Sequence, residues 1–203
     1  MTKKHSLALA FRLLLLAAAA LAVAAAAART ARSSTVTLPP GNAVEQWNKI
    51  AEDTVVTSGA FQNEGFQYMA YESTAVYDAA VSLGHGYKPL RPTFRVWRKA
   101  SSDAAEVEAA YRTLLHYFPS ASATLGAYYG EALAAIPDGP AKLAGQKIGR
   151  VASDQVIRAR TGDGIQPIAS TSTFPTLPPG PGVWRLTPSA YQAPQTPWVG
   201  DMK

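Results

Sequence analysis

The chain has 203 residues, no cysteine and only three histidines, and 47% of its residues are hydrophobic. This length suits about one domain, the lack of cysteine excludes disulfides, and the sequence gives no zinc signature. The net charge is +5, but residues 1–28 hold three of the 19 basic residues and none of the 14 acidic ones, so the remainder is too weakly basic to indicate nucleic-acid binding.

Residues 1–28 have the pattern of a secretory signal peptide. Lys3 and Lys4 precede an apolar run over residues 13–28, which ends in small residues that a signal peptidase can cleave. A transmembrane span needs roughly 20 apolar residues, and Arg12 limits this run on its N-terminal side. We therefore expect cleavage of the segment, no stable membrane span afterwards, and a secreted or periplasmic protein.

The first helix is expected over residues 43–58, after a polar linker over residues 29–42. Asn42 is a natural N-cap for this helix. Apolar side chains recur on one stripe with a period of 3.6 residues: Val44, Trp47, Ala51 and Val55.

A second helix is expected over about residues 63–83, where Gly84 ends it. Its apolar side chains fall within roughly a third of the circumference, and we expect this stripe in the core: Phe66, Met69, Ala70, Ser73, Tyr77, Ala80 and Val81. Residues 85–101 then form a connection, because Pro89 and Pro92 forbid a regular helix across it.

The third helix is expected to begin near Asp103, which has capping-box spacing with Glu106. It has the clearest amphipathic pattern of the chain, in Val107, Ala110, Tyr111, Leu114, Leu115 and Phe118. The second and third helices should therefore form the centre of the core. Four aromatic residues on these stripes are expected to be core rather than a cofactor site: Phe66, Tyr77, Tyr111 and Phe118.

Two further helices complete the predicted bundle. Pro119 ends the third helix and can open the fourth, which the turn at residues 137–140 stops, and a more polar fifth helix covers about residues 140–161. No strand-like alternation persists, so the fold class is all-α, a bundle of about five helices over residues 43–164. Residues 165–203 hold eight of the 15 prolines and should form an irregular tail.

The sequence assigns no catalytic, cofactor-binding or metal-ligating residue. His116 lies opposite the apolar stripe of its helix and should face solvent, and His85 is a lone loop histidine. His5 belongs to the predicted signal peptide. The chain has no clustered acidic set for a metal and no Gly-x-Ser-x-Gly nucleophile elbow.

Two features have both a functional and a structural interpretation. An arginine-rich loop suits a site for a tetrahedral oxyanion, although a solvated surface is the commoner role of such a basic run: Lys88, Arg91, Arg95, Arg98 and Lys99. Asp78 could form a structural ion pair with this loop. Gly145 and Gly149 have a spacing that allows close helix approach, but it has little weight outside a transmembrane segment.

Six short segments, in this order, resemble the N-terminal half of the secreted vanadium-dependent haloperoxidase-like proteins, members of the type 2 phosphatidic acid phosphatase superfamily. The similarity covers about residues 43–200. The segments are Trp47-Asn48-Lys49-Ile50-Ala51 with Thr54-Val55, Ala75-Val76-Tyr77-Asp78-Ala79, Gly86-Tyr87-Lys88-Pro89, Ala110-Tyr111-Arg112 with Phe118-Pro119, residues 135–142, and Pro181-Gly182-Val183-Trp184-Arg185 with Thr187-Pro188.

The resemblance implies an all-helical fold of two bundles that hold vanadate, or phosphate in the related phosphatases. The family's pattern is a Lys reaching an Arg-Pro pair, then Ser-Gly-His, then an Arg followed by a His. Arg91-Pro92 has a lysine, Lys88, only three residues upstream and aligns with a non-catalytic region, so no catalytic residue is transferred. The resemblance therefore implies that the catalytic motifs belong to a half that follows Lys203, and that this chain is inactive alone.

Two function classes remain open from the sequence. The chain is either the non-catalytic part of a haloperoxidase-like or phosphatase-like enzyme, or an exported helical binding or scaffold module that uses the basic loop or the proline-rich tail. In the first case vanadate is implied for the complete protein and no cofactor for this chain. An uncovered apolar face is then expected, which would contact the second half or mediate self-association.

Overall fold

The computed structural model describes most of the chain downstream of the predicted signal peptide. The described residues are 36–60, 62–84, 86–91, 99–165, 177–192 and 196–203. The predicted signal peptide lies outside them, as do residues 29–35 of the predicted linker, and also His85, Arg95 and Arg98.

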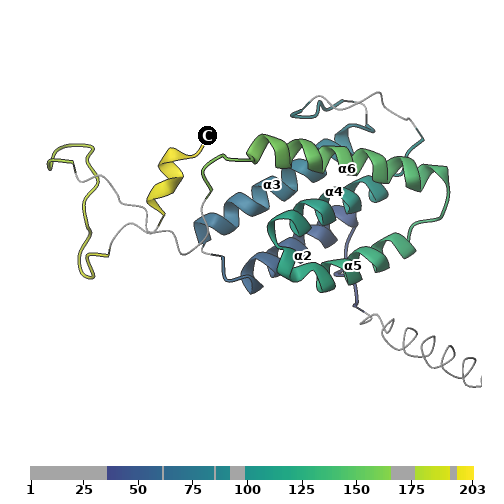
Figure 1. The fold of residues 1–203 in the computed structure, drawn as a ribbon, viewed down its shortest axis with the longest axis horizontal. Helices are drawn as coiled ribbons and strands as arrows, with labels where there is room; N and C mark the ends of the chain where they lie inside the picture. Colours follow the sequence, from purple (N-terminus) through teal and green to yellow (C-terminus); the bar gives the residue numbers. More distant parts are fainter. Residues whose placement is uncertain (1–35, 61, 85, 92–98, 166–176, 193–195) are drawn as a thin grey trace, which may run out of the picture. The chain divides into compact units, whose positions relative to one another are not determined.

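The described residues form five α-helices and contain no strand, which confirms the predicted all-α class (Figure 1). Two short 3-10 helices accompany them. The helices are α2 (Ala43–Thr57), α3 (Gln62–Val81), α4 (Ser102–Tyr117), α5 (Ser122–Ala134) and α6 (Pro140–Arg160), with the 3-10 helices η1 (Pro119–Ala121) and η2 (Pro197–Asp201).

The N-cap of α2 is the predicted one, whereas that of α4 is not. The Asn42 side chain accepts a hydrogen bond from the Glu45 backbone N–H at 3.0 Å, and Glu45 Oε2 accepts from the Asn42 N–H at 2.8 Å, which makes a capping box. At α4 the cap is Ser101, whose hydroxyl accepts from the Ala104 N–H at 3.2 Å. The capping box predicted at Asp103 is therefore wrong, because the chain becomes helical before that residue.

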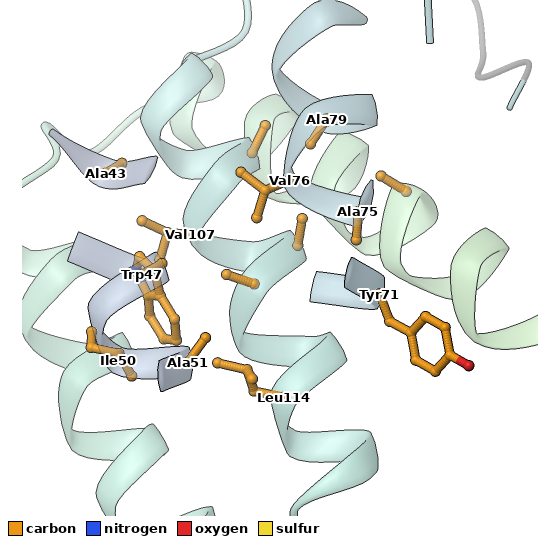
Figure 2. Packing of buried hydrophobic residues seen from close by; sticks show 14 of the residues in the cluster. Ala43, Trp47, Ile50, Ala51, Tyr71, Ala75, Val76, Ala79, Val107 and Leu114 are labelled. Carbon is orange, nitrogen blue, oxygen red and sulfur yellow. The ribbon is translucent and has the colours of Figure 1, made fainter. Parts of the chain in front are cut away.

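Helix α4 is the centre of the bundle, because it contacts α2, α3, α5 and α6. Seven consecutive residues, Ala104 to Ala110, are buried on every side of the helix. Leu114, one turn further on, is 1% exposed. Figure 2 shows Leu114 and Val107 of α4 close to Trp47 of α2 in the same hydrophobic core. This confirms the predicted central role of the third helix.

Helices α4 and α6 approach each other closely at two glycines. A Cβ atom at Gly145 would lie 2.3 Å from the carbonyl oxygen of Ser101, and one at Gly149 would lie 2.1 Å from that of Ala105. Both distances are far shorter than a van der Waals contact, so only glycine fits. We expected the four-residue spacing of these glycines to matter little outside a transmembrane segment, and this prediction was wrong. A core rich in alanine also lets helix backbones come close.

The predicted core face of α3 is wrong. Phe66 is 62% exposed and Tyr77 38% exposed, and Ala70 and Ser73 between them are also exposed. We call these four residues the α3 outer stripe. The buried face lies on the other side of the helix and contains Tyr71, Glu72, Ala75, Val76, Asp78, Ala79 and Ser82. Of the four aromatic residues predicted in the core, Phe118 is buried and Tyr111 half-buried.

The last residues of the chain contact the bundle. The Lys203 backbone N–H donates to the Asp163 carbonyl at 2.9 Å, and Arg160 Nη1 donates to the Lys203 carbonyl at 2.8 Å. Met202 packs against the hydrophobic core, and Trp198 of η2 is 2% exposed. The sequence predicted an irregular tail here, and η2 with its buried tryptophan was not foreseen.

Candidate functional site

The histidines do not form a site in the part of the chain that the structure describes. His116 is exposed at the end of α4, as predicted, where its ring meets the Tyr117 ring edge-on at 4.8 Å. His5 and His85 lie outside the described residues. Among the described side chains, no group of three or more His, Asp or Glu residues could hold a metal ion.

Two of the three described cations of the basic run, Lys88 and Arg91, belong to a loop, residues 86–91, that is attached to α3, and the third, Lys99, is exposed just before α4. Asp78, which is fully buried, accepts a hydrogen bond from the Leu90 backbone N–H at 2.6 Å through Oδ1. The Tyr77 hydroxyl donates to the Lys88 carbonyl at 3.1 Å. Asp78 thus holds the loop through its backbone, and it forms no ion pair with Lys88, Arg91 or Lys99, the described cations of the basic run. Lys88 is exposed, whereas Arg91 is half-buried.

Arg91 borders a hollow of about 310 Å³ that residues from four separate segments line. We call it the basic hollow. Its walls come from α3, the loop 86–91, the C-terminal part of α6 and the end of the chain. The lining residues are Gln67, Ala70, Tyr71, Thr74, Leu90, Arg91, Val156, Arg160, Val199, Met202 and Lys203. Three of them are cationic and none is acidic, so the hollow favours anions.

Arg160 is held in position at the wall of the basic hollow. Arg160 donates a hydrogen bond to the Lys203 carbonyl. Its guanidinium carbon also lies 5.5 Å from the centre of the Tyr71 ring, which is a cation–π arrangement. The Tyr71 hydroxyl donates to the carboxylate of Asp163, which is 3% exposed and also accepts from the Ile165 N–H at 3.1 Å. Arg160 therefore presents its charge from a rigid support.

Tyr71 stays protonated near neutral pH, and its hydroxyl donates to Asp163. Burial raises the pKa of Tyr71 well above its ordinary value, and the hydrogen bond to Asp163 raises this pKa further. Its proton is committed to Asp163. The described lining of the hollow therefore offers hydrogen-bonding and cationic groups.

A second polar cluster joins three helices and is structural. Glu108 of α4, 3% exposed, accepts from the Tyr129 hydroxyl of α5 and lies 3.4 Å from Arg150 of α6. Gln146 donates to the Tyr129 hydroxyl at 2.9 Å. Burial, followed by the bond to Glu108, raises the pKa of Tyr129 to about 12. The cluster links α4, α5 and α6 through satisfied hydrogen bonds.

Glu72 of α3 is a fully buried carboxyl group away from any hollow. Burial raises its pKa to about 7, and the hydrogen bond from Ser73, at 3.4 Å, only partly opposes this shift. Its Oε1 atom has no hydrogen-bond partner among the described residues. A pKa near neutrality suits a general base, but 0% exposure denies a substrate access, so Glu72 matters for stability.

Another hollow, of about 290 Å³, lies between α2 and the η1–α5 segment. Hydroxyl groups dominate its polar lining, including Thr54, Thr57, Ser58, Ser120 and Thr124. Its one charged lining residue, Asp53, is paired with Lys49 in an exposed ion pair on α2. This hollow therefore has no charge of its own to select a ligand.

Sequence reasoning identified Arg91 as a member of a possible oxyanion loop but missed Arg160 and Lys203. These two residues are far from the loop in the chain, and only the return of the C-terminal residues to the bundle brings them to Arg91. No sequence motif joins the three cations. The sequence did give one signal, the arginine-rich composition of the loop.

Among the described residues, no helix combines the length and the apolar character that crossing a membrane requires. No known protein family, curated protein or solved structure matches this chain.

Proposed function

We propose that this chain is the non-catalytic helical module of a secreted, vanadium-dependent haloperoxidase-like or acid-phosphatase-related protein. In this proposal the complete protein binds vanadate or phosphate and oxidises halide with peroxide or hydrolyses phosphate esters. The module packs through the α3 outer stripe against a second, catalytic helical bundle.

The observation that carries the proposal is the exposure of the α3 outer stripe. Phe66 and Tyr77 are large and apolar, and they are more than a third exposed on a regular helix. A helix with an apolar stripe normally buries it against another element. The bundle already fills the opposite side of α3, so the stripe suits a body outside the described residues.

The resemblance supplies the identity of that body. The segments at residues 86–89 and 181–188 lie outside the helices, whereas three others lie on helices that form the bundle, with Trp47 on α2, Ala75 on α3 and Ala110 on α4, all at 0% exposure. These three segments therefore belong to the framework rather than to a site. The resemblance is to a family whose fold has two helical bundles, and this chain corresponds to one of them. This supports a second bundle as the body that covers the α3 outer stripe.

The basic hollow does not fit vanadate as the family holds it. The family uses a histidine to bond the metal, and no histidine is among the described residues that line the hollow. Arg91, Arg160 and Lys203 provide cations without that ligand. The vanadate or phosphate site is accordingly assigned to the catalytic bundle, and no step of the reaction is derived for the residues described here.

The direct test of the function is an activity measurement together with the downstream coding sequence. The purified chain, supplied with vanadate, peroxide and bromide, should oxidise no bromide. The reading frame after the codon for Lys203 should encode Ser-Gly-His and a later Arg/His motif. Bromide oxidation by the chain alone would contradict the proposal. A stop codon at that point would favour the alternative, an exported binding or scaffold module without enzymatic activity.

The docking surface has its own test, with a matched control. Phe66→Ser should lower the fluorescence of a dye that binds exposed apolar surface and should reduce self-association in sedimentation. Val56→Ser is the control, because Val56 is 71% exposed on α2 and lies outside the stripe. Equal effects of the two substitutions would show that the stripe is no special surface.

A further inference from the structure

The basic hollow brings three cationic side chains together, with the buried carboxylate of Asp163 bonded to Tyr71 at its wall. Arg91, Arg160 and Lys203 line it, and none of the three forms an ion pair with an acidic side chain in the described part of the chain. Asp163 and Asp201 lie on neighbouring segments but outside the lining. Cationic side chains that converge from separate segments favour an anionic ligand.

The cations are positioned before any ligand arrives. The bonds from Asp78 to the Leu90 N–H and from Tyr77 to the Lys88 carbonyl hold the loop that bears Arg91. Arg160 is held by the Lys203 carbonyl and by the Tyr71 ring. Preorganised groups lose little conformational freedom on binding, which favours affinity.

The hollow also has an apolar part. Leu90 is 69% exposed and Val199 37% exposed, and both line the hollow beside the cations. A volume of about 310 Å³ falls at the lower end of small-molecule sites. It exceeds what a bare oxyanion occupies, so the hollow has space for an apolar body next to the charged group.

We infer that the basic hollow binds a small organic anion, with its oxyanion group held by Arg91, Arg160 and Lys203 and its short apolar body lying against Leu90 and Val199. The guanidinium groups suit a carboxylate or a phosphate monoester, because both accept paired N–H donors. Gln67 and Thr74 of α3 add neutral hydrogen-bonding groups at the wall. The site adjoins the α3 outer stripe, because Ala70 belongs to both, but Phe66 of the stripe does not line it.

The test is isothermal titration of the purified full chain with four matched probes. Hexanoate and hexyl phosphate carry the anionic head and the apolar body, hexylamine carries the body with the opposite charge, and inorganic phosphate is a head alone. We expect saturable binding of hexanoate, hexyl phosphate or both, with the stronger of the two identifying the head group. Binding should weaken as salt rises.

Three results with these probes would overturn the inference. The first is that neither organic anion saturates the protein below about 10 mM, which corresponds to binding weaker than about 3 kcal/mol. The second is that hexylamine binds as tightly as the organic anions. The third is that inorganic phosphate binds as tightly as hexyl phosphate. The last result would remove the apolar part of the site.

Arg91→Ala locates the site, with Lys88→Ala as the control from the same loop. Arg91 lines the hollow, whereas Lys88 does not. We expect the first substitution to weaken binding about tenfold, as the loss of a charge-assisted hydrogen bond does, and the second to leave it within about twofold. Circular dichroism would verify that both variants fold. Equal losses in the two variants would overturn the placement of the ligand.

Arg160→Lys gives a second check that keeps the positive charge. Lysine cannot reproduce the planar, paired donors of the guanidinium group, so binding of the preferred organic anion should weaken severalfold. Unchanged affinity in this variant and in Arg91→Ala would contradict the site. Because Phe66 does not line the hollow, Phe66→Ser should not affect this binding, which separates failure of this inference from failure of the proposed function.

Discussion

Helices α3 and α4 lie against each other in the bundle but differ in how they use their surfaces. Helix α4 is buried all round from Ala104 to Ala110, whereas α3 buries one face and exposes a regular apolar stripe on the other. Hydrophobic periodicity correctly indicated the buried side of α4 and misplaced that of α3. An apolar stripe therefore indicates a face to be covered, and does not say whether the same chain covers it.

The sequence pattern did not reveal the buried side of α3 because, apart from Tyr71 and Val76, its residues are small or acidic. Ala75 and Ala79 are fully buried, and they alternate along the helix with the buried carboxyl groups of Glu72 and Asp78. Asp78 is partly satisfied by the Leu90 N–H. Small side chains add little to a hydrophobic pattern, although they let helices pack closely.

The largest expected effect is in the centre of the bundle, at Leu114. Leu114→Ala should lower the free energy of unfolding by about 2–5 kcal/mol, because the side chain is almost completely buried and leaves a cavity. Leu143→Ala is the control, since Leu143 is 68% exposed on α6, and should change it by less than about 0.5 kcal/mol. Urea unfolding measures both, and similar midpoints for the two variants would contradict the central position of α4.

The next effect is a pH dependence of stability, which we expect because the buried face of α3 contains the carboxyl group of Glu72. Burial raises the pKa of Glu72 to about 7 from 4.5, so the folded chain holds this proton more tightly than the unfolded chain. The contribution of Glu72 to stability is therefore fully present below pH 4.5 and is lost as pH rises through 7. By pH 8 the loss should reach about 3 kcal/mol.

Glu72→Gln removes that titration while keeping the shape of the side chain. The variant should be more stable than the unsubstituted chain at pH 8 and should show a smaller change in the urea midpoint between pH 5 and pH 8. An unchanged pH dependence would show that Glu72 is not the buried acid that sets it. Glu45→Gln is an exposed control in the capping box of α2 and should leave the pH 5 to pH 8 dependence as it is.

A smaller effect tests the close contact of α4 with α6. Gly149→Ala should lower the free energy of unfolding by about 1–3 kcal/mol, since its Cβ would meet the Ala105 carbonyl. Gly126→Ala on α5 is the matched control, because nothing lies within 4 Å of the added Cβ. This control should stabilise the chain by about 0.5–1 kcal/mol through helix propensity. Stabilisation by both substitutions would mean that α4 and α6 are further apart at Gly149 than the structure places them.

Much of the fold could be predicted from local signals. Asn42 marks the start of α2, and the segment around Gly139 and Pro140 marks the turn before α6, since caps and helix breakers act over a few residues. Trp47, Ala51 and Val55 of the predicted stripe on α2 are buried as predicted, because α2 has a single apolar side and packs it against the rest of the bundle.

The basic hollow could not be predicted, because its residues meet only through tertiary structure. Arg91 precedes a segment outside the described residues, and Arg160 is the last residue of α6. The hydrogen bond from the Lys203 N–H to the Asp163 carbonyl holds the end of the chain beside the end of α6. The roles of Gly145 and Gly149 were also hidden, because sequence spacing gives no distance between two backbones. These features depend on helix packing, which a single-sequence pattern does not encode.

The most direct measurement compares the two faces of α3. Phe66→Ala removes a larger side chain than Val76→Ala, but Phe66 is 62% exposed and Val76 only 4% exposed. In urea unfolding of the purified chain, we expect Phe66→Ala to change the free energy of unfolding by less than about 0.5 kcal/mol and Val76→Ala to lower it by about 2 kcal/mol. A loss at Phe66 as large as that at Val76 would contradict an open docking face on α3.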